Sequence, residues 1–203
     1  AYEITYGDWS SDVCSSDLLK LEPENAMVYW GLARSTSGKR SEDFTREAVK
    51  RKHTVSERER LYIESLEALV SHDALRDRGD DYQRREREYR KVLETLAVKY
   101  PDDMEAKALL ALSSIGAQRY GTELIIREIL AKQPDHPGAH HYRIHNWNYH
   151  EPEQALESCM RYGEIAPNVG HALHMPGHVY ATAGMWHEAA DRKSTRLNSS
   201  HRT

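Results

Sequence analysis

Apolar residues recur at helical spacing along most of the chain, and this pattern predicts an all-α protein. Between polar breaks they are separated by three or four residues, the spacing that places side chains on one face of an α-helix. With capping residues and prolines as boundaries, the pattern predicts helices at about 23–33, 42–52, 56–70, 82–98, 103–114, 122–132, 137–149, 152–165, 170–183 and 186–192. No stretch alternates apolar and polar residues with period two, so no strand is predicted. A strand of four or more residues within 101–192 would contradict this interpretation.

The second half of the chain repeats with a period of 33 residues. Each repeat is marked by a proline and, five residues later, by an alanine: Pro101, Pro134 and Pro167, then Ala106, Ala139 and Ala172. A unit of this length holds two short helices, which cannot bury their apolar face alone and do so by stacking on neighbours. The period therefore predicts a right-handed α-solenoid of stacked antiparallel helix pairs.

The third repeat, which contains GHVYATAGMWHEAA, resembles the Gly-x-x-Tyr-x-x-x-Gly-x-x-x-x-Ala core of the tetratricopeptide repeat. The residues at the signature positions are Gly177, Tyr180, Gly184 and Ala189. In the preceding repeat Ala155 and Pro167 match, while Arg143 and His150 replace the glycines. The segments PGAHHYRIH and APNVGHALHMPGHVY further resemble a bacterial group of tetratricopeptide proteins. The resemblance covers about 19–192 and implies the fold and no particular chemistry.

Composition narrows the class of partner. The net charge of -4 and the pI near 6.3 give no reason to expect nucleic acid or an anionic membrane as a partner. No apolar run approaches the ~20 residues needed to span a bilayer. Two cysteines, Cys14 and Cys159, are too few for a disulfide framework, and Cys159 is expected to be a small core residue.

Both ends of the chain carry Ser-rich strings that resemble translated sequencing-adapter sequence. These strings are DWSSDVCSSDL at 8–18 and KSTRLNSSH at 193–201. We therefore interpret 1–18 and 193–203 as artefactual or disordered ends, and 19–192 as the repeat array. We expect the natural array to extend past both of these ends.

Histidines concentrate in the second and third repeats, where nine of the chain's 12 lie between Pro134 and Glu188. The tetratricopeptide resemblance implies a concave groove lined by the first helix of each repeat, at positions four, seven and eleven residues after the repeat proline. In this chain those positions hold Gly138, His141, His145, His171, His174 and His178. Trp147 and Tyr180, each thirteen residues after a repeat proline, are expected to fill equivalent places between helices beside this groove. His136 and His140 are expected to cap or pack.

Three interpretations of the histidines follow from their spacing. The first is a set of polar residues between helices, bonded to the backbone or to acids such as Glu151, Glu164 and Glu188. The second, which we prefer as a function, is an interaction module that binds a protein segment or a small ligand in the His-lined groove. The third is a metal-binding protein or metal-dependent enzyme, because two imidazoles at i and i+4 can reach one ion. Its ligands would be His141, His145, His174 and His178, and its cofactor Zn²⁺ or another divalent metal; the preferred interpretation needs no cofactor.

Catalytic motifs are not found in the sequence, and we assign no catalytic residue. Neither His-x-x-x-His segment contains the glutamate that acts as general base in HExxH zinc proteases. Pro176 stands between His174 and His178, where it would start or kink a helix and disturb their spacing. The mutual distances of the ring nitrogens of His141, His145, His174 and His178 decide between these interpretations. Convergence within about 4 Å with an acid nearby favours a metal site, and a row along the groove counts against it.

Overall fold

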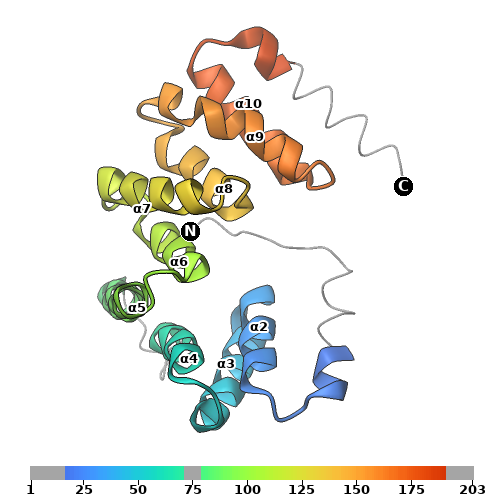
Figure 1. Cartoon of the computed structure of the whole chain (residues 1–203), viewed down its shortest axis with the longest axis vertical. Coiled ribbons are helices and arrows are strands. Elements are labelled where there is room, and N and C mark those ends of the chain that lie inside the picture. Colours follow the sequence, from blue (N-terminus) through green and yellow to red (C-terminus); the bar gives the residue numbers. More distant parts are fainter. Residues whose placement is uncertain (1–16, 71–78, 191–203) are drawn as a thin grey trace. The chain divides into compact units, whose positions relative to one another are not determined.

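The protein is helical throughout the residues that its computed structural model describes, which are 17–70 and 79–190, and no strand occurs among them (Figure 1). The prediction of an all-α protein is confirmed. The adapter-like strings lie outside the described residues except for Asp17 and Leu18, and most of the polar break at 72–81 lies outside them as well. The chain divides into two compact units, 1–102 and 103–203, and each is described by itself.

The first unit consists of consecutive helices that pack in pairs. After a helical turn at 17–21, its helices are α2 (Ala26–Ser35), α3 (Gly38–Arg51), η1 (Lys52–Thr54), α4 (Glu57–Leu69) and α5 (Gly79–Lys99). Helix α2 packs against α3, and α4 packs against α5. The predicted capping box begins α4: the Ser56 hydroxyl accepts from the Glu59 amide, and the Glu59 carboxylate accepts from the Ser56 amide at 3.0 Å.

The second unit carries the repeats and the histidines. Its helices are α6 (Met104–Ser114), α7 (Arg119–Lys132), α8 (Pro137–Trp147), η2 (Pro152–Ala155), α9 (Leu156–Ile165) and α10 (Gly170–Thr182), followed by a helical turn at 186–190. Each helix packs on the next, and the alternate helices α6 and α8, and α8 and α10, also touch. This second kind of contact brings side chains together that lie a full repeat apart in sequence.

The 33-residue period sets the helix boundaries. Helices α6, α8 and α10 each begin three residues after a repeat proline, and α5, α7 and α9 each end two residues before one. The three repeat alanines, Ala106, Ala139 and Ala172, are all 0% exposed. A small buried side chain lets the helices pack closely, which is consistent with the recurrence of alanine at this position.

Small differences from the predicted boundaries occur where a first or last turn is polar. Helix α3 begins at Gly38 rather than at 42, because its polar first turn leaves no apolar pattern to read. The predicted helix at 152–165 begins instead as the 3₁₀ turn of η2, and α8 ends at Trp147, with Asn148 as its C-cap. The first and last turns of a helix are the parts that apolar periodicity predicts least well.

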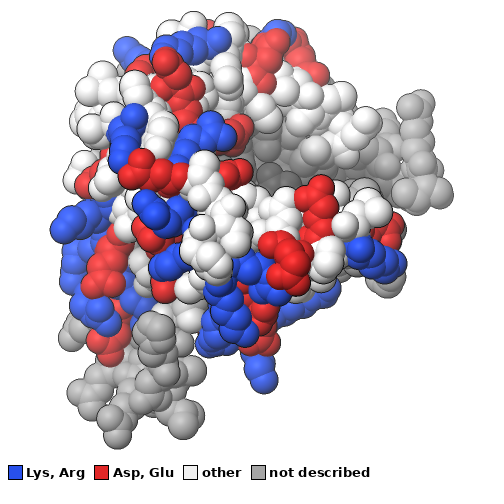
Figure 2. Space-filling model, turned by 60° about the horizontal axis from the view of Figure 1, so that its bottom comes forward, with Lys and Arg blue, Asp and Glu red and all other residues white. Residues whose placement is uncertain are grey.

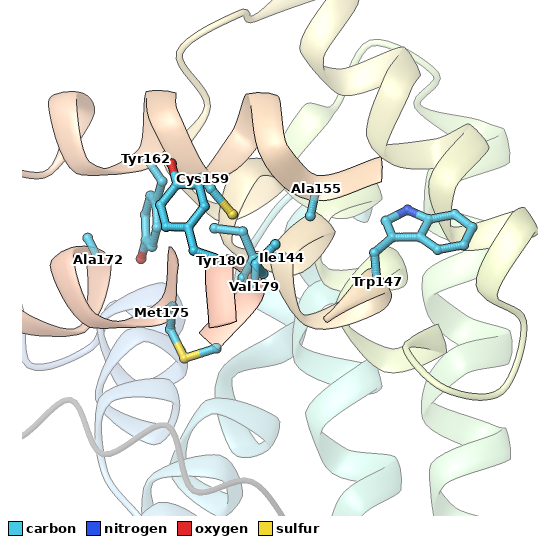
Figure 3. Close-up of a cluster of buried hydrophobic side chains, with 9 residues drawn as sticks. All are labelled: Ile144, Trp147, Ala155, Cys159, Tyr162, Ala172, Met175, Val179 and Tyr180. Atoms are coloured by element: carbon cyan, nitrogen blue, oxygen red, sulfur yellow. The ribbon is translucent and has the colours of Figure 1, made fainter. Parts of the chain in front are cut away.

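One hydrophobic core cluster of the second unit lies between α8, α9 and α10 (Figure 3), and another lies between α6, α7 and α8. The buried members of the first cluster are Ile144, Trp147, Ala155, Cys159, Tyr162, Ala172, Met175, Val179 and Tyr180. Cys159 is a fully buried core residue, as predicted. Trp147 and Tyr180 both belong to this cluster, at 1% and 4% exposed.

A buried carboxylate ties α7 to α8. Glu123, on α7, is 4% exposed and accepts from the indole N–H of Trp147 at 2.7 Å. The guanidinium of Arg143, 8% exposed, donates to the same carboxylate at 3.0 Å and also reaches Glu157. Arg127 completes the set with a 2.7 Å bond. The carboxylate therefore satisfies a buried charge and a buried donor at once.

Gly184 ends α10 for a conformational reason. Its φ of +76° lies in the left-handed region, which residues with a Cβ adopt only with strain. The Met185 amide donates to the Tyr180 carbonyl at 2.8 Å and the Gly184 amide to the Ala181 carbonyl at 3.2 Å, which together make a Schellman motif. The glycine predicted to be a structural position of the repeat thus closes its first helix.

Charges of both signs are interspersed on the surface. Figure 2 shows Lys and Arg next to Asp and Glu over the face in view, without a large area of one sign. On α5, whose sequence is rich in arginine, Arg84 pairs with Glu88 at 2.9 Å, the i,i+4 arrangement expected of a solvated face. In the described part of the chain, no helix has the length and the apolar character needed to cross a membrane.

Replacing Glu123 by alanine is expected to lower the free energy of unfolding by about 3 kcal/mol, because it leaves the buried Arg143 charge and the Trp147 N–H without their shared acceptor. Urea unfolding measures this. The control is Asp135→Ala, which removes an exposed ion pair with Arg161 and should cost at most about 1 kcal/mol. Equal effects of the two variants would contradict a structural role for the buried carboxylate.

Replacing Gly184 by alanine is expected to destabilise the protein by about 1–2 kcal/mol, since a Cβ is strained at a positive φ. Gly31 offers a matched control inside α2, where an added Cβ meets no atom within 4 Å. There alanine should stabilise the helix by about 0.5–1 kcal/mol. Equilibrium unfolding of the two variants should therefore shift in opposite directions, and shifts of the same sign would refute the account of Gly184.

Candidate metal centre

The five histidines predicted to line the groove lie on α8 and α10, two helices that pack against each other. His141 and His145 lie one turn apart on α8, and His171, His174 and His178 follow one another along α10 at spacings of three and four residues. Core residues of the same helices are buried beside them: Ile144 and Trp147 on α8, and Met175 and Val179 on α10. His141 is buried with these residues, whereas His171 and His178 are exposed on α10.

Three of these imidazoles bring their Nε2 atoms close together. The Nε2 atom of His141 lies 2.9 Å from that of His171 and 2.9 Å from that of His145. One ring nitrogen from each of the three residues lies within 4.8 Å of the other two. The three-histidine site defined by His141, His145 and His171 therefore joins two helices across 30 residues of sequence.

Hydrogen bonding alone does not account for this arrangement. In a neutral imidazole, each ring nitrogen has either a proton or a lone pair. The Nε2 atom of His141 therefore makes one well-aligned N–H···N bond, with His145 or with His171, while both lie equally close. A metal ion removes this conflict, because it accepts the lone pairs of all three nitrogens.

The spacing of the nitrogens suits a tetrahedral ion. Zinc–nitrogen bonds of about 2.0–2.1 Å at tetrahedral angles place the ligand nitrogens about 3.3 Å apart. The observed contacts of 2.9 Å and the outer limit of 4.8 Å lie on either side of that value. Coordination of one ion would require the nitrogens to move toward this common spacing.

Burial keeps these imidazoles neutral. His141 is 3% exposed, and its ring stacks on Tyr162 with centroids 5.3 Å apart. Burial, and then the positive charges that His145 and His171 would carry, lower the pKa of His141 to about 3. Burial and the charges of His171 and His178 lower the pKa of His145 to about 4, and burial lowers that of His171 as well. Neutral imidazole is the form that binds metal.

The other two histidines of α10 form a separate pair. The Nε2 atoms of His174 and His178 lie 2.8 Å apart, and the ring centroids 4.5 Å apart. Both lie on the helix predicted at 170–183, because α10 runs through Pro176 from Gly170 to Thr182 and no new helix starts at the proline. The proline removes one backbone donor, and its ring is fully buried in the core.

In the structure, the four predicted metal ligands fall into two groups and do not all converge on one point. His141 and His145 come together with His171, and His174 comes together with His178. His171 was predicted for the groove and not for the metal set. Its signal in the sequence is its position three residues before His174, which puts it on the same face of α10 as the other two.

The remaining predicted residues have other roles. His136 is the N-cap of α8 and accepts from the Ala139 amide at 3.1 Å, and His140 contacts Ser158 and the Pro134 carbonyl. These positions agree with the expected capping and packing. Glu151 accepts from Tyr120, and Glu164 pairs with Arg161, so these two acids are engaged away from the histidines.

The donor set indicates the kind of ion. Imidazole nitrogen suits zinc, copper, nickel and iron, whereas magnesium, calcium and manganese prefer carboxylate and carbonyl oxygen. Among the described residues, the one cluster whose ligand atoms converge closely enough for a metal consists of imidazoles alone. The site therefore fits a transition metal and not an alkaline-earth ion.

Comparison with known proteins gives no further guide to this site: no family model and no curated protein matches the chain.

The stability of the metal-free protein should fall as the pH drops below about 6.5, the pKa of an unfolded histidine. Between that value and about 4, the unfolded chain binds protons that His141 and His145 in the folded chain do not, so acid favours unfolding. Urea unfolding with a chelator, from about pH 7 down to about pH 5, measures this loss. In His141→Gln, His145→Gln the slope should be shallower, and an unchanged slope would contradict the burial of neutral imidazoles.

Proposed function

We propose that this protein binds a divalent transition metal, with zinc the first candidate, through His141, His145 and His171. The observation that carries the proposal is the convergence of three Nε2 atoms from two helices, with that of His141 2.9 Å from each of the other two. Depressed pKa values favour it further, because the ligands are already neutral at physiological pH and binding displaces few protons.

We further propose that the chain is a tetratricopeptide-like right-handed α-solenoid. Support comes from the helix starts at Met104, Pro137 and Gly170, which recur every 33 residues, and from the contacts between alternate helices. Stacked helix pairs would make such contacts between the first helices of neighbouring repeats. In this arrangement, the metal site bridges the first helices of two repeats.

A metal site is favoured over a peptide-binding groove by the burial of its central residue. His141 is 3% exposed and covered by Tyr162, so its ring is accessible to an ion more readily than to a peptide side chain. Trp147 and Tyr180 lie in the core and offer no open aromatic surface. Binding of a protein segment in the groove stays a prediction.

Three protein ligands leave a fourth tetrahedral position open. Structural zinc sites are usually closed by four protein ligands, whereas three ligands and a water are typical of sites where zinc acts on a substrate. His171 is solvent-exposed and gives the ion a route in. The proposal extends to metal binding and to the linkage of α8 with α10, and it assigns no reaction, because no general base is identified beside the ion.

The test is zinc titration of the chelator-treated protein by calorimetry, together with thermal unfolding. Zinc should bind with a stoichiometry of at least one and raise Tm, because a ligand that binds only the folded state stabilises it. In His141→Gln, His171→Gln the affinity should fall by more than about tenfold, since loss of even an outer-shell partner costs about 10–100-fold.

His53→Gln is the matched control, because His53 is an exposed histidine of the first unit, outside the cluster. Its zinc affinity and Tm should equal those of the unchanged protein. Circular dichroism establishes that the double variant remains helical. Equal zinc affinity in the double variant and the control would exclude the proposed site.

A further inference from the structure

His174 and His178 have the geometry of a second ligand pair. They lie one turn apart on α10 with their Nε2 atoms 2.8 Å apart and their rings nearly perpendicular, at 84°. His178 is exposed and His174 is partly exposed, so the pair opens to solvent. Neither residue is needed for the convergence of the three-histidine site.

The backbone that carries the pair is held by the core. Met175, Pro176 and Val179 are all buried, and they fix the turn of α10 from its inner side. Gly177, between the two histidines on the outer side, adds no side chain. The pair is therefore preorganised: binding an ion orders two rings on an already rigid turn and does not order backbone.

We propose that His174 and His178 bind a second divalent transition-metal ion, so that the chain holds a two-ion histidine centre with one buried and one exposed ion. This inference rests on the proposed function only for the first ion, the one bound by the three-histidine site. Two imidazoles at i and i+4 on a helix present both nitrogens to one ion, and imidazole selects zinc, copper or nickel.

The two ions would lie close together. His171, a ligand of the first ion, precedes His174 by three residues on the same face of α10, a rise of about 4.5 Å. The two positive ions would repel each other, which makes an anion or hydroxide between them favourable.

The two sites differ in the number of coordination positions that protein ligands leave free. The first ion has three protein ligands, of which His141 is buried, so it should bind more tightly and exchange more slowly than the second. The second ion has two protein ligands and an exposed face, so water completes its coordination and is replaceable by an oxygen anion such as a carboxylate or phosphate. The exposed ion is thus the one able to take up an external ligand.

The experiment counts ions by native mass spectrometry and measures each affinity by titration with Zn²⁺ and with Co²⁺. The unchanged protein should bind two ions, the second more weakly. His174→Gln, His178→Gln should bind one ion with the affinity of the tight site within a few-fold. His141→Gln, His145→Gln should keep only the weak ion, and His53→Gln should keep both.

Cobalt distinguishes the sites, because tetrahedral Co²⁺ absorbs visible light far more strongly than six-coordinate Co²⁺. The tight ion should give the strong absorption and the second ion a weak one. Adding inorganic phosphate should change the spectrum of the unchanged protein and leave that of His174→Gln, His178→Gln as it was.

The outcomes separate the two proposals. Two bound ions in His174→Gln, His178→Gln would overturn the second site. A single bound ion in the unchanged protein that is lost in either double variant would also overturn it. In the first case the pair is not a ligand, and in the second all five histidines share one ion. Loss of one ion from His174→Gln, His178→Gln but none from His141→Gln, His145→Gln would uphold the second site and remove the first. Circular dichroism on each variant checks that it is folded.

Discussion

The packing of α8 against α10 is the constraint on which the candidate site depends. These helices belong to neighbouring repeats, and their contact is sealed by buried residues such as Ile144 and Val179 from the two sides. Everything that the histidines can do follows from this contact, because residues 30 positions apart in sequence meet only through it. The buried carboxylate of Glu123 secures the other side of α8 by engaging Arg143 and Trp147, so that α8 is held from α7 as well as from α10. A site that spans two packed helices is as rigid as their shared core.

Much of this fold can be predicted from the sequence, because its signals are local and repeated. The prolines end one helix and precede the next, and the capping box at Ser56 satisfies backbone donors that any helix start leaves open. The repeat alanines, all fully buried, mark the close approaches between helices. Polar first turns, such as that of α3 from Gly38, could not be predicted from apolar spacing, because a solvated turn contains no apolar residues at regular spacing.

The grouping of the histidines could be predicted only in part. Spacing shows that His171, His174 and His178 share a face of α10, because three, four and seven residues correspond to rotations of about 300°, 40° and 340°. Spacing does not show which of them faces His141, since that depends on how α10 is rotated against α8. The structure selects His171, whose Nε2 lies 2.9 Å from that of His141. The buried network around Glu123 was missed for the same reason: nothing local to α7 indicates that Arg143 and Trp147 meet there.

The burial of the imidazoles explains why a metal ion suits this place. A lone buried histidine can satisfy its ring nitrogens with the backbone or a hydroxyl, as His140 does with Pro134 and Ser158. His141 has instead two other imidazoles at its Nε2 atom, and protonating any of them is disfavoured by burial and by its neighbours. A proton therefore cannot hold the three rings together as a stable cation, whereas a metal ion can, because its bonds to three nitrogens replace the hydration that it loses. The same depressed basicity that makes the cluster a poor acid–base group leaves its lone pairs available for coordination.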